Sequence, residues 1–70
     1  FGLRFFFYSN EHKPIHVHVR NADGEAKFNV VTIKCIENRG LKSKDLKLAR
    51  IAIQENKDLI IQKWNHYFNN

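Results

Sequence analysis

The stretch that decides the fold is residues 15–30, which read Ile-His-Val-His-Val-Arg, then Asn-Ala-Asp-Gly, then Glu-Ala-Lys-Phe-Asn-Val. In residues 15–20 an aliphatic residue alternates with a polar one, which is the period of a β-strand that buries one face. Residues 25–30 alternate in the same way. The pair Asp23-Gly24 between them is a strong signal for a tight hairpin turn. The stretch therefore predicts an antiparallel hairpin with one apolar face and one polar face.

Two further strands are predicted, one before this hairpin and one after it. Residues 3–8 are mostly aromatic, and residues 32–37 carry Ile33 and Cys35 in alternation with polar residues. The link between Phe28 and Ile33 has no residue that clearly favours a chain reversal. This segment is therefore either one long bent strand or a place where loop residues are missing from the sequence.

The C-terminal part of the chain has helical spacing. Residues 43–55 form the first helical segment, which Ser43 is expected to cap. Asn56 is expected to cap a second segment, and whether the two segments form one kinked helix or two stays open. The apolar face of the first segment consists of Leu46, Leu48, Ala49, Ala52 and Ile53. The apolar face of the second consists of Ile60, Ile61, Trp64, Tyr67 and Phe68.

These elements predict an α+β fold, in which a small antiparallel sheet of three to four strands carries one or two C-terminal helices on one face. We expect a single domain over residues 1–70, with a β-sheet half at residues 1–38 and a helical half at residues 41–70. The sheet face away from the helices would then show a mixture of polar and aromatic side chains. They are Arg4, Phe6, Tyr8, His16, His18, Arg20, Lys27, Asn29 and Lys34.

The composition narrows the range of functions. The chain has 70 residues, one Cys and a formal net charge of +5. A single Cys excludes an internal disulfide and favours a cytoplasmic location, and no apolar run reaches the ~18 residues that span a bilayer. A chain this short buries only about 60% of its unfolded surface, so a homodimer or a protein partner is expected to add stability. The positive charge favours anionic partners, nucleic acid among them.

Three of the four histidines fall within seven residues: His12, His16 and His18. His16 and His18 are two apart on a predicted strand, so they project from the same face, roughly 7 Å apart at Cα. Imidazoles at this spacing bind divalent transition metals such as zinc, and His12 on the preceding loop is the third expected ligand. Glu11 and Glu25 are candidates for a fourth. The alternative is that these histidines are solvent-facing or structural polar residues.

The same face supports two hypotheses that need no metal. Cations and aromatic rings on a sheet bind single-stranded nucleic acid, and the residues of this kind are Arg4, Tyr8, Arg20, Lys27 and Lys34. Two histidines and a cation also supply the base, the acid and the positive charge that a ribonuclease-like hydrolase needs. The catalytic candidates for that reaction are His16, His18 and Arg20.

Several motifs are spread along the whole chain. They are Phe1-Gly2-Leu3, Tyr8, Glu11-His12-x-Pro14-x-His16-x-His18-Val19, Gly24-Glu25-Ala26 and Trp64. Together they resemble a family of small bacterial proteins called domain of unknown function 4160. The family's motif has a second Pro where this chain has Ile15, and an aromatic residue where it has Val17. The resemblance marks the motif's histidines and Pro14 as the functional focus.

The resemblance implies a context and no established activity. Members of the family are often found beside another small domain of unknown function, in gene pairs reminiscent of toxin–antitoxin modules. We therefore expect a cytoplasmic interaction module of toxin–antitoxin type that binds a protein partner and has a link to nucleic acid. The alternative function is a ribonuclease-like hydrolase, metal-dependent or metal-free, that uses His12, His16 and His18.

Overall fold

The structure is a computed structural model that describes residues 2–68. Four strands come first, and they are β1 (Arg4–Phe6), β2 (His16–Arg20), β3 (Glu25–Asn29) and β4 (Lys34–Arg39). Two helices follow, α1 (Ser43–Glu55) and α2 (Lys57–Phe68). The strands form one sheet in the order β1-β2-β3-β4, with every neighbouring pair antiparallel. The predicted α+β fold, with its four-stranded sheet and two C-terminal helices, is confirmed.

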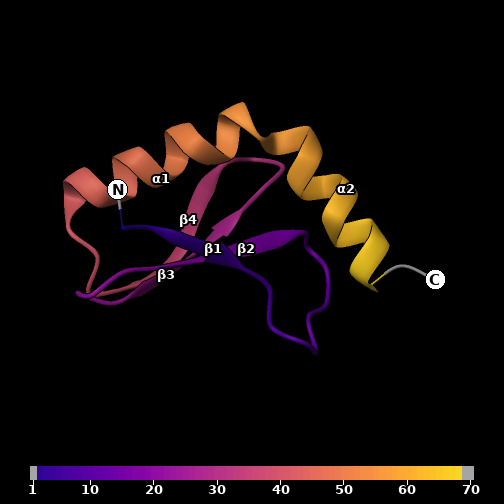
Figure 1. Cartoon of the computed structure of the whole chain (residues 1–70), viewed down its shortest axis with the longest axis horizontal. Coiled ribbons are helices and arrows are strands. Elements are labelled where there is room, and N and C mark those ends of the chain that lie inside the picture. The colour runs from indigo at the N-terminus through magenta and orange to yellow at the C-terminus, as the bar shows by residue number, and fades with distance from the viewer. Residues whose placement is uncertain (1, 69–70) are drawn as a thin grey trace.

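The core lies between the sheet and α1, and Figure 1 shows α1 running across the sheet. The aliphatic positions of the central hairpin supply the sheet side, because side chains two apart on a strand share a face. Ala49 and Ile53, one helical turn apart on α1, supply the other side and are fully buried. The buried cluster consists of Val17, Val19, Ala26, Phe28, Val30, Leu41, Ala49 and Ile53. No helix of the described residues is long and apolar enough to cross a membrane.

The turn between β2 and β3 forms as the Asp-Gly signal predicts. The side-chain Oδ1 of Asn21 accepts hydrogen bonds from the backbone N–H groups of Asp23 and Gly24, at 2.8 and 3.2 Å. Gly24 is required by a close approach, because a Cβ atom there would lie 1.9 Å from the carbonyl oxygen of Arg39. The hairpin turn therefore packs directly against the end of β4, at a distance that only a glycine allows.

The link between β3 and β4 is not the long bent strand that was one interpretation of the sequence. Residues 30–33 form a turn between two paired strands. The Asn29 Oδ1 accepts a hydrogen bond from the Thr32 N–H at 3.0 Å, which is how Asn favours turns. Ile33 adopts a φ of 57°, an unusual conformation for a β-branched residue. Asn29 is the residue that favours this turn. In the sequence it also fits the alternating pattern of the preceding strand, so the pattern assigns it to the strand.

Some predicted boundaries and faces were wrong. Strand β1 ends at Phe6 and does not reach Tyr8. Lys42, not Ser43, is the N-cap of α1, and it makes no side-chain capping hydrogen bond. Two helices form, separated at Asn56, which is the C-cap of α1. The predicted apolar faces also included two side chains that are exposed in the structure, Leu48 and Tyr67.

Candidate metal centre

The sheet face away from α1 carries three rows of cross-strand neighbours. Directly opposed residues in an antiparallel sheet share a face, so the strand register defines these rows. The first row consists of Arg4, Arg20, Glu25 and Arg39. The second consists of Phe6, His18, Lys27 and Glu37. The third consists of His16, Asn29 and Lys34. We call this surface the outer face.

A carboxylate joins the two strand histidines at the centre of the outer face. Glu11 Oε1 lies 2.8 Å from His16 Nε2, and Glu11 Oε2 lies 2.7 Å from His18 Nε2. The three side chains are only 6%, 10% and 11% exposed for His16, His18 and Glu11. One nitrogen or oxygen atom from each lies within 4.8 Å of the other two. This is the one group of at least three potential metal ligands that meets that limit within the described part of the chain.

The loop between β1 and β2 places Glu11 over the strand. Residues 7–15 leave the sheet after Phe6 and fold back beside β2. The Tyr8 N–H donates a 3.0 Å hydrogen bond to Glu11 Oε2, which fixes the carboxylate. Burial acts to raise the pKa of the Glu11 carboxyl, but the hydrogen bonds from Tyr8, His16 and His18 outweigh it and hold that pKa below its usual range. Glu11 is therefore held as an anion between the two imidazoles.

The second nitrogen of each histidine also faces an oxygen atom. His16 Nδ1 lies 2.7 Å from the Pro14 carbonyl oxygen, and His18 Nδ1 lies 3.4 Å from Glu25 Oε2. A carbonyl only accepts, so His16 Nδ1 carries a hydrogen, and its neutral form presents the lone pair of Nε2 to Glu11. A lone pair facing a carboxylate at 2.8 Å is repulsive, unless the imidazole is protonated or a cation lies between them. The contacts therefore fit either a protonated imidazole that donates to both Pro14 and Glu11 or a cation held between the His16 and Glu11 side chains.

Aromatic side chains cover the histidines. The Phe6 ring stacks on His18 with centroids 5.6 Å apart, and Tyr8 meets the same ring edge-on at 4.5 Å. Trp64 of α2 contacts His16 at 5.1 Å. The Tyr8 hydroxyl donates to the carboxylate of Glu25 at 2.9–3.0 Å, and this hydrogen bond raises the pKa of the Tyr8 phenol. Both imidazoles are therefore held in fixed orientations.

The donor set suits a divalent transition metal. Two imidazoles and one carboxylate are a known ligand combination for zinc and for non-haem iron. Metal-bound histidines typically donate their other N–H to a carbonyl or carboxylate. The Pro14 carbonyl is placed to accept from His16 Nδ1 in this way, and the Glu25 carboxylate lies near His18 Nδ1 at 3.4 Å. Ligand atoms around a tetrahedral zinc ion lie roughly 3.4 Å apart, given Zn–N and Zn–O distances near 2.1 Å. The three candidate ligand atoms lie within 4.8 Å of one another, so side-chain shifts would be enough to reach this spacing.

The structure brings together two of the three predicted metal ligands and replaces the third. His12 is exposed and lies outside the group, and Glu11 takes its place. Glu11 was a candidate for a fourth ligand only, because its position depends on how the loop folds. Of the alternative that the histidines are solvent-facing or structural, the solvent-facing part is wrong for His16 and His18, which are buried, and the structural part stays open.

The predicted nucleic-acid cations lie on the same outer face as this centre, and Tyr8 contacts the His18 ring. Arg4 and Arg20 are cross-strand neighbours, Lys27 lies beside His18, and Lys34 closes the third row. The Arg4 guanidinium also lies over the Phe6 ring, 5.5 Å from its centroid. A cleft of about 320 Å³ adjoins the cluster on this face. It is lined by Tyr8, His18, Glu25, Ala26, Lys27, Glu37 and Arg39.

Comparison with known proteins addresses the resemblance that the motifs suggested. The profile of the family described as Domain of unknown function (DUF4160) matches residues 2–65. Comparison with curated proteins and with solved structures finds no match. The matched range includes both cluster histidines, Glu11 and Trp64. The chain therefore belongs to the family of domain of unknown function DUF4160.

Proposed function

We propose that the protein binds a divalent transition metal through Glu11, His16 and His18, and that it hydrolyses phosphodiester bonds of nucleic acid on the outer face. The observation that carries the proposal is the buried convergence of three ligand atoms within 4.8 Å. Buried ionisable groups are costly unless they are paired or bind a metal. A chain with so small a core tolerates this cost where the groups have a function.

The surroundings of the centre support a hydrolytic reaction. A three-ligand site leaves a coordination position for water, which a bound zinc ion makes acidic enough to act as a nucleophile near neutral pH. Glu11, His16 and His18 are assigned as ligands, so the two histidines no longer serve as general acid and base. Arg20 and Arg4 supply positive charge beside the centre, which suits the phosphates of a polyanion.

The second candidate function is the interaction module of toxin–antitoxin type, in the cytoplasm, with a protein partner. A separate observation favours it. Leu59 and Tyr67 of α2 are 50% and 67% exposed, and both border an apolar groove beside the edge strand β1. Contiguous apolar surface of this kind marks interaction sites in small proteins. The two functions are compatible, since a hydrolase acting on cellular RNA needs a partner that restrains it.

Metal analysis of protein purified without an affinity tag tests the first proposal. We expect close to one zinc or iron ion per chain, and loss of that ion in the double variant His16→Ala, His18→Ala. His12→Ala is the matched control, because it removes a neighbouring histidine outside the cluster and is expected to keep the ion. A folded wild-type protein that takes up no metal from excess zinc would rule the proposal out.

Cleavage of a labelled single-stranded RNA tests the reaction itself. Wild-type protein loaded with metal is expected to cleave, and the double histidine variant is expected to lose cleavage. Equal cleavage by wild type and variant would identify a contaminating nuclease and contradict the hydrolase. Metal binding without cleavage of RNA or DNA would restrict the centre to a structural role.

A further inference from the structure

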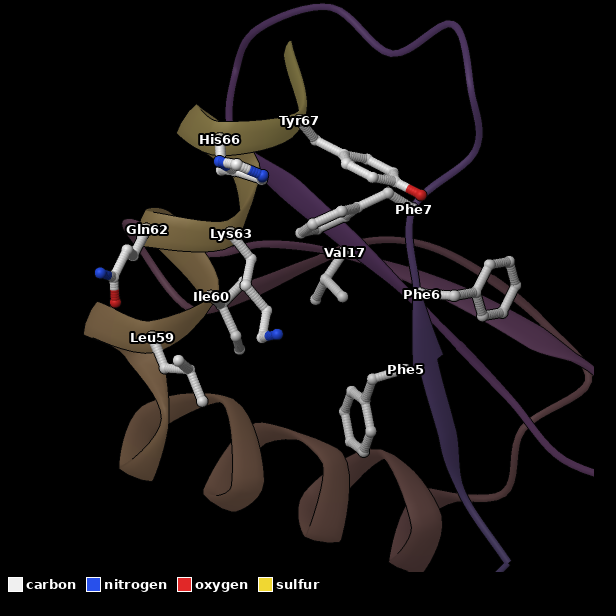
Figure 2. Close-up of a pocket in the computed structure, with 10 residues that line it drawn as sticks. All are labelled: Phe5, Phe6, Phe7, Val17, Leu59, Ile60, Gln62, Lys63, His66 and Tyr67. Atoms are coloured by element: carbon white, nitrogen blue, oxygen red, sulfur yellow. The ribbon is translucent and has the colours of Figure 1, made fainter. Parts of the chain in front are cut away.

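A second concave surface lies on the opposite side of β1 from the metal centre. It is a groove of about 710 Å³ between β1 and α2. Figure 2 shows the rings of Phe5 and Phe7 on the side of β1 that faces the helices, while the Phe6 ring points away. The described residues that line the groove are Phe5, Phe6, Phe7, Val17, Leu59, Ile60, Gln62, Lys63, His66 and Tyr67. The floor is thus apolar and aromatic, and the polar side chains come from α2.

The strand that borders this groove is an edge strand. β1 is the first strand of the sheet and pairs only with β2 among the described elements. An edge strand offers alternate backbone N–H and C=O groups that another extended segment can pair with. Such strand addition takes its affinity from main-chain hydrogen bonds, and its specificity from the pockets that receive alternate side chains. Apolar side chains of an added strand would meet Phe5, Phe7 and Leu59.

The charge of the groove distinguishes between two occupants, a second copy of this chain and a segment of another protein. None of the described lining residues is acidic, whereas Lys63 is cationic and extends into the opening. Arg4 lies at the start of the edge strand itself. A second copy that paired through its own β1 would bring another Arg4 and Lys63 to the same groove, and each copy has a net charge of +5. Charge complementarity therefore favours a partner segment with acidic side chains.

We propose that this groove binds one extended segment of a partner protein, in which acidic and branched apolar residues alternate, by adding it as a strand to the edge of β1. The inference deepens the proposed interaction role and is independent of the metal centre. The apolar side chains of the segment lie on Phe5, Phe7 and Leu59. Its acidic side chains project to the other face of the extended sheet, on the side of Arg4.

A dye-labelled synthetic peptide provides the test. The peptide is about eight residues long, near the usual length of a strand, and alternates aspartate or glutamate with valine or isoleucine. Fluorescence anisotropy is expected to show saturable binding to the full chain. A peptide with lysine in place of the acids is expected to bind at least about tenfold more weakly. A peptide with proline at alternate positions is expected not to bind, because it lacks the main-chain donors.

Two variants locate the binding surface. Leu59→Glu is expected to weaken peptide binding by about tenfold or more, the effect of losing a central apolar contact. Ile51→Glu is the matched control, since Ile51 is 47% exposed against 50% for Leu59, and it lies on α1 outside the groove. Hydrogen exchange adds a second readout, because strand addition is expected to slow amide exchange within residues 4–6.

The remaining outcomes overturn the proposal in distinguishable ways. Equal peptide binding by wild type and Leu59→Glu would place the site elsewhere. Concentration-dependent dimers that Leu59→Glu abolishes, without peptide binding, would make a second copy the occupant. A cellular partner that binds Leu59→Glu as tightly as wild type would contradict the groove and leave the interaction role standing. If no protein partner is found and no peptide binds, both the groove proposal and the interaction role are wrong.

Discussion

Strand β2 is buried on both of its faces, but by different means. On the inner face Val17 and Val19 pack against an apolar core and are 2% and 0% exposed. On the outer face His16 and His18 are 5% and 8% exposed, covered by aromatic rings and a loop carboxylate. Burial of the inner face stabilises the fold through the hydrophobic effect. Burial of the outer face needs compensating contacts for every polar group, so the fold alone does not account for the two histidines as it does for the two valines.

The inner face is expected to give the largest effect on stability. Phe28 is fully buried, with 0% of its surface exposed to solvent. Phe28→Ala should lower the free energy of unfolding by about 3–5 kcal/mol. That is most of the stability of a small domain, so Phe28→Leu serves as a milder variant that stays folded. Urea denaturation measures both. A loss below about 1 kcal/mol for Phe28→Ala would mean that this side is not the core.

Metal is expected to give the next largest effect, through the outer face. Zinc at a hundred times its Kd should stabilise the folded chain by about 2.7 kcal/mol. For a domain of this size, that free energy corresponds to a rise in Tm of roughly 10–20 °C. Thermal unfolding followed by circular dichroism, with chelator as the reference, measures the shift. If zinc leaves the Tm unchanged while calcium or magnesium raises it, the outer face does not hold a transition-metal site.

Glu11→Gln separates the ligand role from a structural role. The amide oxygen can replace Oε2 and accept from Tyr8 N–H and His18 Nε2–H, while the amide nitrogen donates to His16 Nε2. The contact of His16 Nδ1 with the Pro14 carbonyl is unchanged. Because these hydrogen bonds persist, we expect metal-free stability to change by only about 0.5–1.5 kcal/mol. The stabilisation by zinc should disappear, since an amide is a poor zinc ligand.

The opposite result for Glu11→Gln would be informative. A variant that still gains the full zinc-dependent rise in Tm shows that Glu11 is no ligand. A variant that unfolds without metal shows that the carboxylate serves mainly as an anion for two protonated histidines. The matching variant for comparison is Glu37→Gln, which changes an exposed carboxylate of the second row. It is expected to keep both the stability and the zinc response.

The inner face was predictable from the sequence, and the outer face only in part. Alternation in β2 and β3 gave the core positions Val17, Val19, Ala26 and Phe28, since a strand's period is a local property. The pairing of His16 with His18 was local in the same sense. The burial of both histidines was not, because it depends on where residues 7–15 fold back and on Trp64 reaching His16 from α2. Ligand choice between Glu11 and its neighbour His12 rests on the same loop geometry.

The smallest expected effect concerns nucleic acid and compares the two sides of the molecule. Lys34 ends a row of the outer face, whereas Lys47 lies on α1, on the opposite side of the sheet. If RNA lies on the outer face, Lys34→Ala should lower affinity by about 1 kcal/mol or less, regardless of sequence. It should also reduce the salt dependence of binding by about 0.7 in the slope of log K against log salt, the share of one phosphate contact on a single strand. Lys47→Ala should change neither quantity. Binding isotherms at several salt concentrations measure both, and equal effects of the two variants would show that RNA is attracted by net charge alone.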